Sequence, residues 1–482
     1  MTDIVRVLEI EYSHRWMETR FPFQYGIASM TRLPHLFLQA KLQVNGAVID
    51  GLSSEGLPPK WFTKNPTTLF EEDLPEMLAA IEHAVKTAVA LGEKESVFGF
   101  WNALYREQDA WSKSEGLPPL LAHLGTSLVE RAVIDGFCRA RGKPFGVLLR
   151  GNGLGIDLGR IHSELKGMDA KDLLPDVPLE CIAIRHTVGL GDPLTKNEIS
   201  AEDQIDDGLP HSLEESIDCY GLLYFKVKIR GDLEADVARL KKIASLLARK
   251  VPGARITFDG NEQFRDIAQF REHWEAYMRE PELESLLDPA CLLFVEQPLH
   301  RDFALLDSVG AALAEWPEAP PMIIDESDGE LSSLSRALEL GYRGTSHKNC
   351  KGVFKGIANR CLLRLKHEQS PEGGPWVMSG EDLANVGPVA LLNDLSVMAN
   401  LGIDHVERNG HHYFAGLSMY PKGMQERVLT QHSDVYKSSE KGFPTLRIHN
   451  GMLGIRTITE AAFGCSLDDW EHLGEPGMPQ SE

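Results

Sequence analysis

The chain lacks the long apolar segments that membrane-spanning helices require. None of its uninterrupted apolar runs approaches the roughly 18 residues needed to cross a bilayer. The N-terminus carries acids such as Asp3 and Glu9 where a signal peptide would need an apolar stretch. Positive charge is also scarce, since 49 Lys and Arg residues stand against 71 Asp and Glu residues and the net charge is −22. This balance disfavours binding to nucleic acid or to an anionic membrane, and it attracts metal cations.

Paired cysteines and nucleotide-binding glycine patterns are missing as well. The seven cysteines are odd in number, lie far apart and never form a Cys-x-x-Cys pair. We therefore expect reduced thiols and a cytoplasmic protein. Gly151–Gly155 lacks the Gly-x-Gly-x-x-Gly spacing of dinucleotide-binding loops. His411 and His412, which we expect on the last strand, have no third soft ligand at a suitable spacing and are interpreted as polar lining.

The length and composition favour a globular protein of more than one part. The chain has 482 residues, of which 43% are hydrophobic and 25% are charged. The first sixty residues alternate like strands and turn at Asn45-Gly46, and helical spacing follows over residues 71–91 and 124–142. We therefore predict an α+β capping domain at 1–150, a barrel domain at 151–428 and a C-terminal segment at 429–482 that returns to the cap.

Beyond about residue 178 the sequence alternates between short apolar runs and helical stretches. Such alternation predicts β-α units and a parallel sheet. The expected strands cover 181–186, 222–228, 255–259, 292–296, 322–325, 344–348, 376–381 and 403–408. Eight units of this kind predict the α/β fold class and a (β/α)8 barrel.

Three consecutive predicted strands end in an acid. These acids are Asp259, Glu296 and Asp325, and the C-terminal ends of barrel strands form the active-site rim. Three converging carboxylates would repel one another without a cation between them, and a set of oxygen ligands favours a hard ion such as Mg²⁺, with Mn²⁺ as a substitute. The alternative is that each acid caps the following helix or pairs with a surface lysine.

Lysines form the second group of candidates. Lys226 and Lys228 are two residues apart on one strand and therefore share a face, and the apolar Phe225 and Val227 place that face inside the barrel. We expect burial and mutual repulsion to lower the pKa of such a lysine. Lys348, at the end of the sixth strand, should face Lys228 across the barrel mouth. Lys351 competes with it but would point to the opposite face if the strand continued.

These motifs, taken in order, resemble the enolase superfamily, and specifically its muconate lactonizing enzyme-like group. That group includes dipeptide epimerases and o-succinylbenzoate synthase, with mandelate racemase as a relative. The matching segments are Lys226-Val227-Lys228, Asp259-Gly260-Asn261, Glu296-Gln297-Pro298, Asp325-Glu326-Ser327 and Lys348. Phe21–Gly26, which contains Phe23 and Tyr25, resembles the mobile specificity loop of the cap. The segment between Asp259 and Glu296 is longer than the group usually has.

The resemblance implies a chemistry. It implies Mg²⁺ held by Asp259, Glu296 and Asp325, and removal of the proton next to a carboxylate through a metal-stabilised enediolate. Lys228 and Lys348 would act as acid and base, and Lys226 would stabilise the anion, since a Lys or His base beside Mg²⁺ is the known pattern of this superfamily. Racemisation or epimerisation of an amino-acid-derived carboxylate is the preferred outcome. β-Elimination, as in acid-sugar dehydration, and cycloisomerisation stay open.

Other expectations are less specific. Asn261 and Glu326 lie within the matched motifs, whereas Glu381, Arg185 and Asn409 lie near predicted strand ends and suit either substrate binding or structure. The partner is a small carboxylate, with no nucleic acid and no membrane, and we expect a homo-oligomer. Two rivals belong to other classes: a Schiff-base aldolase with a nucleophilic lysine, and a barrel that binds a small acid without turnover.

Overall fold

The N-terminal region is an antiparallel sheet. The computed structural model describes residues 3–25, 27–467 and 473–480, and its first strands are β1 (Val5–Tyr25), β2 (Ala28–Val44) and β3 (Ala47–Gly56). β2 and β3 form the predicted hairpin, and Asn45 and Gly46 at its turn have φ of 49° and 86°. Positive φ at both positions is what a two-residue turn between twisted strands requires.

Helices cover this sheet and form the rest of the cap. They are α1 (Pro59–Phe62), α2 (Phe70–Ala90), α3 (Val97–Glu115), α4 (Pro119–Arg141) and α5 (Phe145–Arg150). α2 and α4 confirm the two helices that the apolar spacing predicts. α4 is buried from Leu120 to Cys138, and it approaches β3 so closely that a Cβ on Gly51 would lie 2.1 Å from the carbonyl oxygen of Ala132. Glycine at this position is therefore a packing requirement.

The barrel contains the eight predicted strands in the described part of the chain. They are β4 (Cys181–Val188), β5 (Tyr224–Lys228), β6 (Arg255–Asp259), β7 (Leu292–Glu296), β8 (Met322–Ile323), β9 (Gly344–His347), β10 (Val377–Gly380) and β11 (His405–Glu407). They run parallel in the order β8-β7-β6-β5-β4-β11-β10-β9. A parallel bridge between Ile324 and Thr345 joins the two ends of this order. The sheet is thus closed, which confirms the predicted (β/α)8 barrel with a capping domain.

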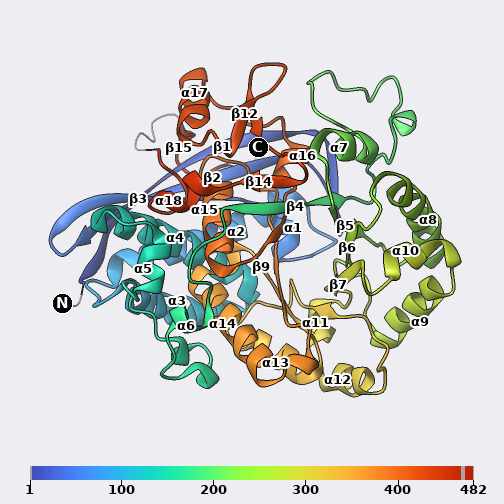
Figure 1. Cartoon of the computed structure of the whole chain (residues 1–482). Coiled ribbons are helices and arrows are strands. Elements are labelled where there is room, and N and C mark those ends of the chain that lie inside the picture. Colours follow the sequence, from blue (N-terminus) through green and yellow to red (C-terminus); the bar gives the residue numbers. More distant parts are fainter. Residues whose placement is uncertain (1–2, 26, 468–472, 481–482) are drawn as a thin grey trace.

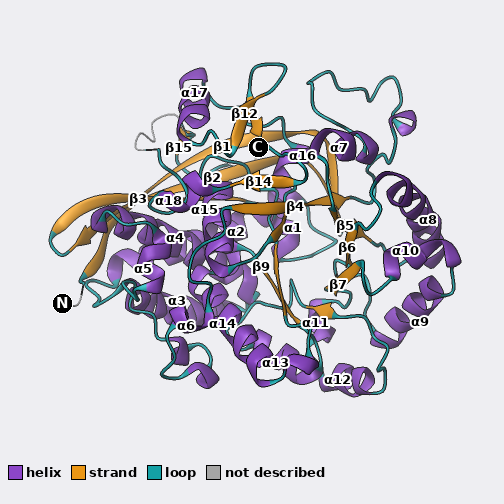
Figure 2. Ribbon diagram, in the orientation of Figure 1, coloured by secondary structure: helices purple, strands orange, loops and turns teal. Residues whose placement is uncertain are grey.

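Helices surround the barrel strands on the outside (Figures 1 and 2). They are α6 (Ala170–Leu173), α7 (Leu213–Tyr220), α8 (Leu233–Lys250), α9 (Ile267–Met278), α10 (Glu284–Leu287), α11 (Arg301–Ala304), α12 (Asp307–Ala314), α13 (Ser333–Leu340), α14 (Val353–Gln369) and α15 (Ala390–Leu401). Their apolar faces pack on strands that are buried on both sides, as parallel strands require. α9 and α10 occupy the long segment between Asp259 and Glu296.

The C-terminal segment contacts both parts of the molecule. It follows α16 (Gly410–Tyr413) and the first turns of α17 (Lys422–Gln431), and it contains β12 (Tyr436–Ser438), β13 (Pro444–Leu446), β14 (Met452–Gly454), α18 (Arg456–Glu460) and β15 (Glu475–Pro476). β14 pairs with β4 of the barrel, whereas β15 pairs with β1 of the cap. The segment therefore ties the cap sheet to the barrel by backbone hydrogen bonds on both sides.

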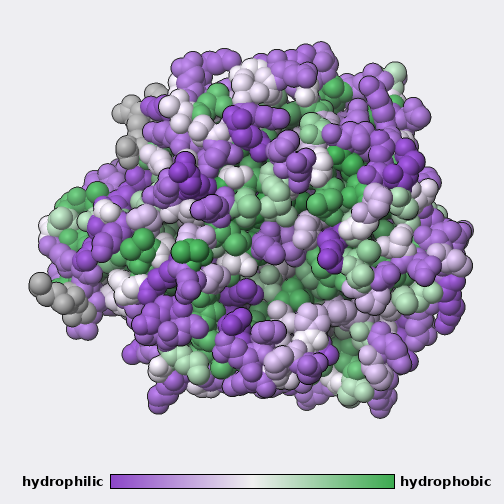
Figure 3. All heavy atoms as spheres, in the orientation of Figure 1, coloured by the Kyte–Doolittle hydropathy of each residue, from purple (hydrophilic) through white to green (hydrophobic). Residues whose placement is uncertain are grey.

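The surface is largely hydrophilic on the face that Figure 3 shows. Polar and charged residues predominate around the outline of the molecule, and apolar residues form scattered patches between them. No helix in the described ranges has the length and apolar character needed to cross a bilayer.

Candidate active site

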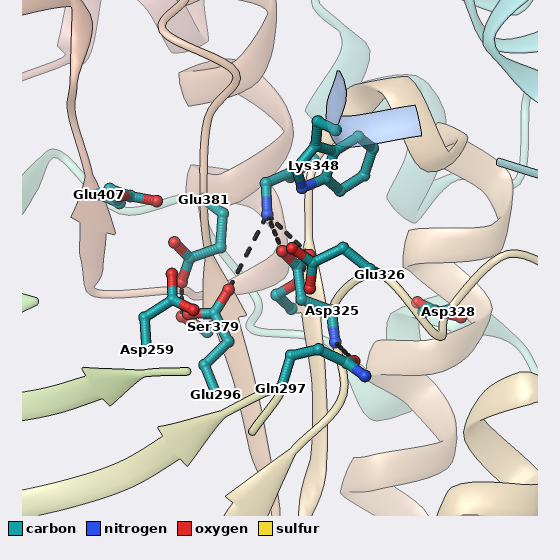
Figure 4. A network of polar contacts seen from close by, with 12 residues as sticks. Asp259, Glu296, Gln297, Asp325, Glu326, Asp328, Lys348, Ser379, Glu381 and Glu407 are labelled. Carbon is teal, nitrogen blue, oxygen red and sulfur yellow. Dashed lines mark hydrogen bonds and ion pairs between the residues drawn. The ribbon is translucent and has the colours of Figure 1, made fainter. Parts of the chain in front are cut away.

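The carboxyl ends of the barrel strands carry a set of acidic side chains. Asp259 and Glu296 end β6 and β7 and are opposite each other in the register of these strands. Asp325 follows β8, Glu381 follows β10, and Glu407 ends β11. All five carboxylates are buried, and Figure 4 shows them gathered around one space. Parallel strands bring them together because their carboxyl ends share one rim of the barrel.

Lys226 lies at the centre of these acids. Its Nζ is 2.9 Å from Asp259 Oδ2, 2.8 Å from Glu296 Oε2, 2.7 Å from Glu381 Oε2 and 3.0 Å from Glu407 Oε2. The side chain is buried. One ammonium group thus balances four carboxylates, each on a different strand or just after it.

Lys228 lies on the same face of β5, one step closer to the mouth. Its Nζ donates to Asp259 Oδ2 at 2.6 Å and to Asn261 Oδ1 at 2.7 Å. Side chains two residues apart on a strand point the same way, so the structure places both lysines inside the barrel as the sequence indicates. Phe225 and Val227 are buried on the other face, towards the helices.

Lys348 follows β9, on the other side of the barrel mouth. Its Nζ is 2.6 Å from Asp325 Oδ2 and 3.9 Å from Glu296 Oε1, and it lies 5.0 Å from the centre of the Trp61 ring. In the closed order of strands, β9 is four places from β5 in either direction. Lys228 and Lys348 therefore come from opposite sides of the barrel.

Lys351 also points towards the site, because the strand on whose continuation its opposite orientation depended ends before it. β9 ends at His347, and a 3₁₀ helix, η5 (Asn349–Lys351), follows. With three residues per turn, positions three apart in such a helix lie on the same side. Lys351 Nζ consequently lies 2.8 Å from Asp325 Oδ1. Only Lys348 of the two lines the central cavity.

The pKa values of Lys226 and Lys348 run opposite to the lowering that the sequence predicts for a buried lysine. Burial alone would lower the pKa of Lys226, but the charges of Asp259, Glu296 and the other two acids outweigh burial and raise it well above its usual value. Burial likewise opposes the charged form of Lys348, and Asp325 and Glu296 raise its pKa. The prediction was wrong because it considered the repulsion from the neighbouring lysine and left out the attraction of the surrounding acids. These acids are far from Lys226 in the sequence and come close to it only in the folded barrel.

The acids divide into two electrostatic groups. Burial, reinforced by Glu381, raises the pKa of Glu296 well above its usual range although Lys226 opposes this. Burial also raises the pKa of Glu407 to about 7. Burial would raise the pKa of Asp325 too, but Lys348 and Lys351 hold it well below its usual range. Glu296 is thus the strand-end acid of the predicted metal set whose negative charge is least compensated.

The donor set matches a hard divalent cation in chemistry. Among the described residues, no group of three or more His, Cys, Asp or Glu side chains has an arrangement that could hold a metal ion, because ammonium groups stand between the acids. Both carboxylate oxygens of Glu296 are buried and neither meets the geometry of a hydrogen bond, although Lys226 Nζ forms an ion pair with Oε2 at 2.8 Å. Three carboxylates from adjacent strands supply the oxygen ligands that Mg²⁺ prefers. In the type of ligand, though not in their present arrangement, these residues therefore fit the predicted ion.

A cavity with about 430 Å³ of empty space lies over these groups. The barrel contributes its polar wall, which includes Lys226, Lys228, Asp259, Asn261, Asp325, Lys348, Asp382, Glu407 and Asn409. The cap and the loop after β10 contribute an apolar wall of Phe23, Met30, Pro58, Trp61, Leu383 and Ala384. The cavity therefore has one charged side and one apolar side.

The predicted supporting residues lie at different depths. Phe23 and Asn409 line the cavity, and Asn409 donates to Glu407 at 3.1 Å. Asn261 lines it too, and its Nδ2 lies 3.5 Å from Glu326. Arg185 lies deeper in the barrel, where it donates to Glu381, to Ser379 Oγ at 2.7 Å and to His405 at 2.6 Å. Tyr25 is the last residue of β1 and pairs in register with Ala28.

Several residues escaped the sequence analysis. Trp61 and Met30 line the cavity, and neither belongs to a motif that the sequence analysis matched. Arg301 holds the backbone of α1 by donating to the carbonyls of Trp61 and Phe62, both at 2.8 Å. Glu262 binds that same arginine at 2.7 Å.

The two adjacent histidines do not lie on the last strand. His411 and His412 are in α16, because β11 ends at Glu407. Both are buried, and His412 packs its ring 4.6 Å from that of His186. They form part of an aromatic layer outside the central cavity.

Comparison with known proteins gives a fold and no closer relative. No protein-family model and no curated protein sequence matches the chain. Solved structures match it over nearly its whole length. Muconate lactonizing enzyme from Pseudomonas fluorescens, complexed with muconolactone, gives a TM-score of 0.57 at 17% identity and covers 96% of this chain and 97% of its own.

Two further structures belong to the same set. A dipeptide epimerase from Enterococcus faecalis, complexed with Mg and the dipeptide L-Leu-L-Tyr, gives a TM-score of 0.58 at 13% identity and covers 95% and 99% of the two chains. An enolase from Bradyrhizobium, complexed with magnesium and mandelic acid, gives 0.55 at 14% identity with 94% of each chain covered. The resemblance drawn from the motifs is therefore matched by the fold: the chain folds like the mandelate racemase and muconate lactonizing enzyme group of the enolase superfamily.

Proposed function

We propose that the chain is a Mg²⁺-dependent enzyme that removes the proton α to a carboxylate and returns it to the other face, a racemase or epimerase. One observation carries the proposal. Lys228 and Lys348 come from strands four places apart in the closed barrel and line the same cavity as Asp259 and Asp325. The mandelic acid and dipeptide in the similar structures support a small carboxylate as substrate.

Asp259, Glu296 and Asp325 would hold the ion. When bound, Mg²⁺ would attract the substrate carboxylate and neutralise the charge that develops on it as the α-proton leaves. Lys226, buried among the acids, keeps a positive charge facing the same place. An anion formed in the cavity therefore meets fixed positive charge without reorganisation of water.

The two outer lysines would move the proton. An ammonium cannot accept a proton, and Asp259 and Asp325 hold the Nζ atoms of Lys228 and Lys348 at 2.6 Å. If these carboxylates became ligands of the ion, their ion pairs with the two lysines would weaken, because the ion would share their negative charge. A lysine so released can act as a base near neutral pH, and the opposite lysine, still charged, can act as the acid.

Screening carboxylates in D2O for deuterium uptake at the α-carbon tests the proposal. The library should contain α-hydroxy acids, dipeptides and N-acyl amino acids, each as both stereoisomers, and product analysis would separate epimerisation from β-elimination or cycloisomerisation. Exchange with inversion supports the proposal. Loss of water without inversion would identify a lyase, and ring closure without inversion would identify a cycloisomerase; either result would reject the racemase or epimerase. For variants that remove Lys228 or Lys348, Lys86→Ala is the matched control, because Lys86 is an exposed surface lysine.

Borohydride reduction separates the remaining rivals. A Schiff-base aldolase would be trapped covalently on a lysine when borohydride is added with its substrate, whereas proton transfer by lysine leaves nothing to trap. A barrel that only binds an acid would show saturable binding without exchange.

A further inference from the structure

A buried acid of the cap bonds to the backbone of the barrel. Glu130 lies in α4, and its side chain is buried. Its two carboxylate oxygens accept hydrogen bonds from the backbone amides of Val353 at 2.9 Å and Phe354 at 2.8 Å. These are the first two residues of α14, the helix that follows β9. The two bonds therefore join the cap to the start of a barrel helix.

The start of α14 has no capping side chain of its own. The first amides of an α-helix lack acceptors within the helix, and a Ser, Thr, Asp or Asn just before it usually supplies one. Gly352 stands in that position, and its φ of 107° is in the region that favours glycine. Glu130, 223 residues before Val353 in the chain, supplies the acceptors instead. Its negative charge also suits the positive end of the helix dipole.

Lys348 is tied closely to this helix start. Residues 349–352 are all that separate it from Val353, and they form η5 and Gly352. Within this turn the amide of Lys351 donates to the carbonyl of Lys348, and that of Gly352 to the carbonyl of Asn349, both at 2.9 Å. A shift of the start of α14 would therefore move the backbone of Lys348, because one hydrogen-bonded turn connects them.

The neighbour of Glu130 faces another part of the cap. Arg131 is buried and lies 2.8 Å from Glu55 Oε2 in β3. β3 leads into α1, where the Trp61 ring lies 5.0 Å from Lys348 Nζ. α4 thus connects two contacts of the cap with Lys348, one at its ammonium group through Trp61 and one at the backbone behind it through Glu130.

A gain in stability does not explain a carboxylate at this place. Burial raises the pKa of Glu130 to about 7, although the amides of Phe354 and Val353 and the charge of Arg131 lower it. Ionisation of such a group costs stability in the folded state. The two hydrogen bonds are therefore better explained by the helix start that they fix in place.

We infer that Glu130 is a positioning residue, which fixes the start of α14 and thereby holds Lys348 in place on its side of the cavity. The inference rests on the proposed function, because it gives the cap control over one of the two proton-transferring lysines. Lys228 is held differently, since it lies within β5 and donates to Asp259 and Asn261. Loss of Glu130 should therefore affect the substrate face that Lys348 serves more than the face that Lys228 serves.

Backbone hydrogen exchange of the full chain tests the first step without turnover. Mass spectrometry would follow the amides of residues 349–354 in the wild type, Glu130→Ala and Glu130→Gln. We expect exchange at least about tenfold faster in Glu130→Ala, both at the start of α14 and in η5, because local opening spreads through one connected turn. Glu130→Gln keeps one carbonyl oxygen as an acceptor and should lie in between. Faster exchange confined to Val353 and Phe354 would overturn the inference.

The two stereoisomers of one substrate test the second step within one sample. α-Deuterium exchange would be measured on both enantiomers of the N-acyl amino acids and α-hydroxy acids of the D2O screen, and Lys348→Ala assigns the isomer that Lys348 serves. Glu130→Ala should lower the rate of that isomer about tenfold or more relative to the other, because a misplaced reacting group is costly. Partial unfolding would lower both rates alike.

Asp135→Asn is the matched control. Asp135 is a buried acid of the same helix, but its Oδ2 accepts from the amide of Leu52 at 3.0 Å, within the cap. The variant should leave both the exchange of residues 349–354 and the ratio of the two isomers at the wild-type values. A ratio that falls alike in Glu130→Ala and Asp135→Asn would overturn the inference.

The two measurements separate this inference from the proposed function. Faster exchange of η5 in Glu130→Ala, with no deuterium uptake by any carboxylate even in the wild type, would keep the link between the cap and Lys348 and reject the proposed reaction. Deuterium uptake whose isomer ratio does not change in Glu130→Ala would keep the reaction and reject the positioning role of Glu130.

Discussion

The two walls of the central cavity differ in the kind of side chain that they bury. The barrel wall buries charge: Lys226, Lys228, Asp259 and Asp325 have lost nearly all contact with water, and the two lysines lie 2.9 and 2.6 Å from Asp259. The cap wall instead buries apolar side chains. Buried charges tolerate little change, because removing one leaves its partners unpaired, whereas apolar contacts can be exchanged with modest loss.

The difference assigns chemistry to one wall and selectivity to the other. The charged groups come from strands whose register fixes them, such as Lys228 opposite Asp259 and Asp259 opposite Glu296. The apolar groups come from the tip of a hairpin, from α1 and the proline before it, and from the loop after β10. The barrel holds α1 through the Arg301 side chain. We expect changes in the barrel wall to abolish turnover and changes in the cap wall to alter KM.

Removing the metal or one of its ligands should have the largest effect. Chelation should abolish α-proton exchange, and Mg²⁺ or Mn²⁺ should restore it, because the bound ion would neutralise the charge that develops on the carboxylate as the α-proton leaves. Glu296→Gln keeps the volume of the side chain and should cost about 10³-fold or more in kcat/KM, as expected when a group that stabilises developing charge is lost. Full activity of Glu296→Gln, or of the protein in excess chelator, would reject the site.

The lysine variants should separate the two faces of the substrate. If Lys228 and Lys348 serve opposite faces of a planar anion, Lys228→Ala should lose exchange from one stereoisomer by about 10²- to 10⁴-fold and retain exchange from the other. Lys348→Ala should show the converse, and both should lose interconversion. Proton NMR of each isomer in D2O measures this. A variant that still interconverts the isomers fully would show that its lysine is neither acid nor base.

More of the barrel than of the cap could be predicted, because each pattern that indicates a barrel strand lies within one short segment of the sequence. The strands β5, β6 and β7 end in Lys228, Asp259 and Glu296, so each of these candidates could be picked out from one short apolar run. The direction of the Lys226 pKa could not be found in this way, because its four acids come from four other strands. Trp61 and Met30 reach the cavity only through the packing of the cap on the barrel, and the sequence carries no pattern for that contact. The orientation of Lys351 could not be predicted, because it depended on where β9 ends and the sequence does not mark the change from β9 to η5.

The contact that joins cap and barrel should be sensitive to acid. Burial would raise the pKa of Glu262, but its hydrogen bonds and charge pairing with Arg301, and the charge of Lys64, lower it from 4.5 to about 2. A carboxylate with a lowered pKa in the folded state adds stability above its unfolded value, and this is lost as the pH falls from about 4.5 to 2. The contribution is at most roughly 3 kcal/mol at neutral pH.

Urea unfolding of the wild type and of Glu262→Gln between pH 2 and 7 measures this contribution. The difference in unfolding free energy should be greatest at neutral pH and should shrink below pH 4.5. A difference that stayed constant down to pH 2 would show that the ion pairs of Glu262 with Arg301 and Lys64 do not carry it. Glu275→Gln, at an exposed helical pair with Arg271, is the matched control.

Trp61 provides the finest test of the comparison, because it belongs to the cap wall and yet touches a group of the barrel wall. Its ring lies 5.0 Å from Lys348 Nζ, and Arg301 holds its backbone from the barrel side. If the cap wall sets selectivity, Trp61→Leu should raise KM about tenfold, the loss expected for a cation–π contact and some apolar area, and change kcat little. Trp61→Phe keeps an aromatic face and should lie closer to the wild type. A loss in kcat as large as that of Lys348→Ala would place Trp61 with the catalytic groups, and the division between a reacting wall and a selecting wall would fail at this residue.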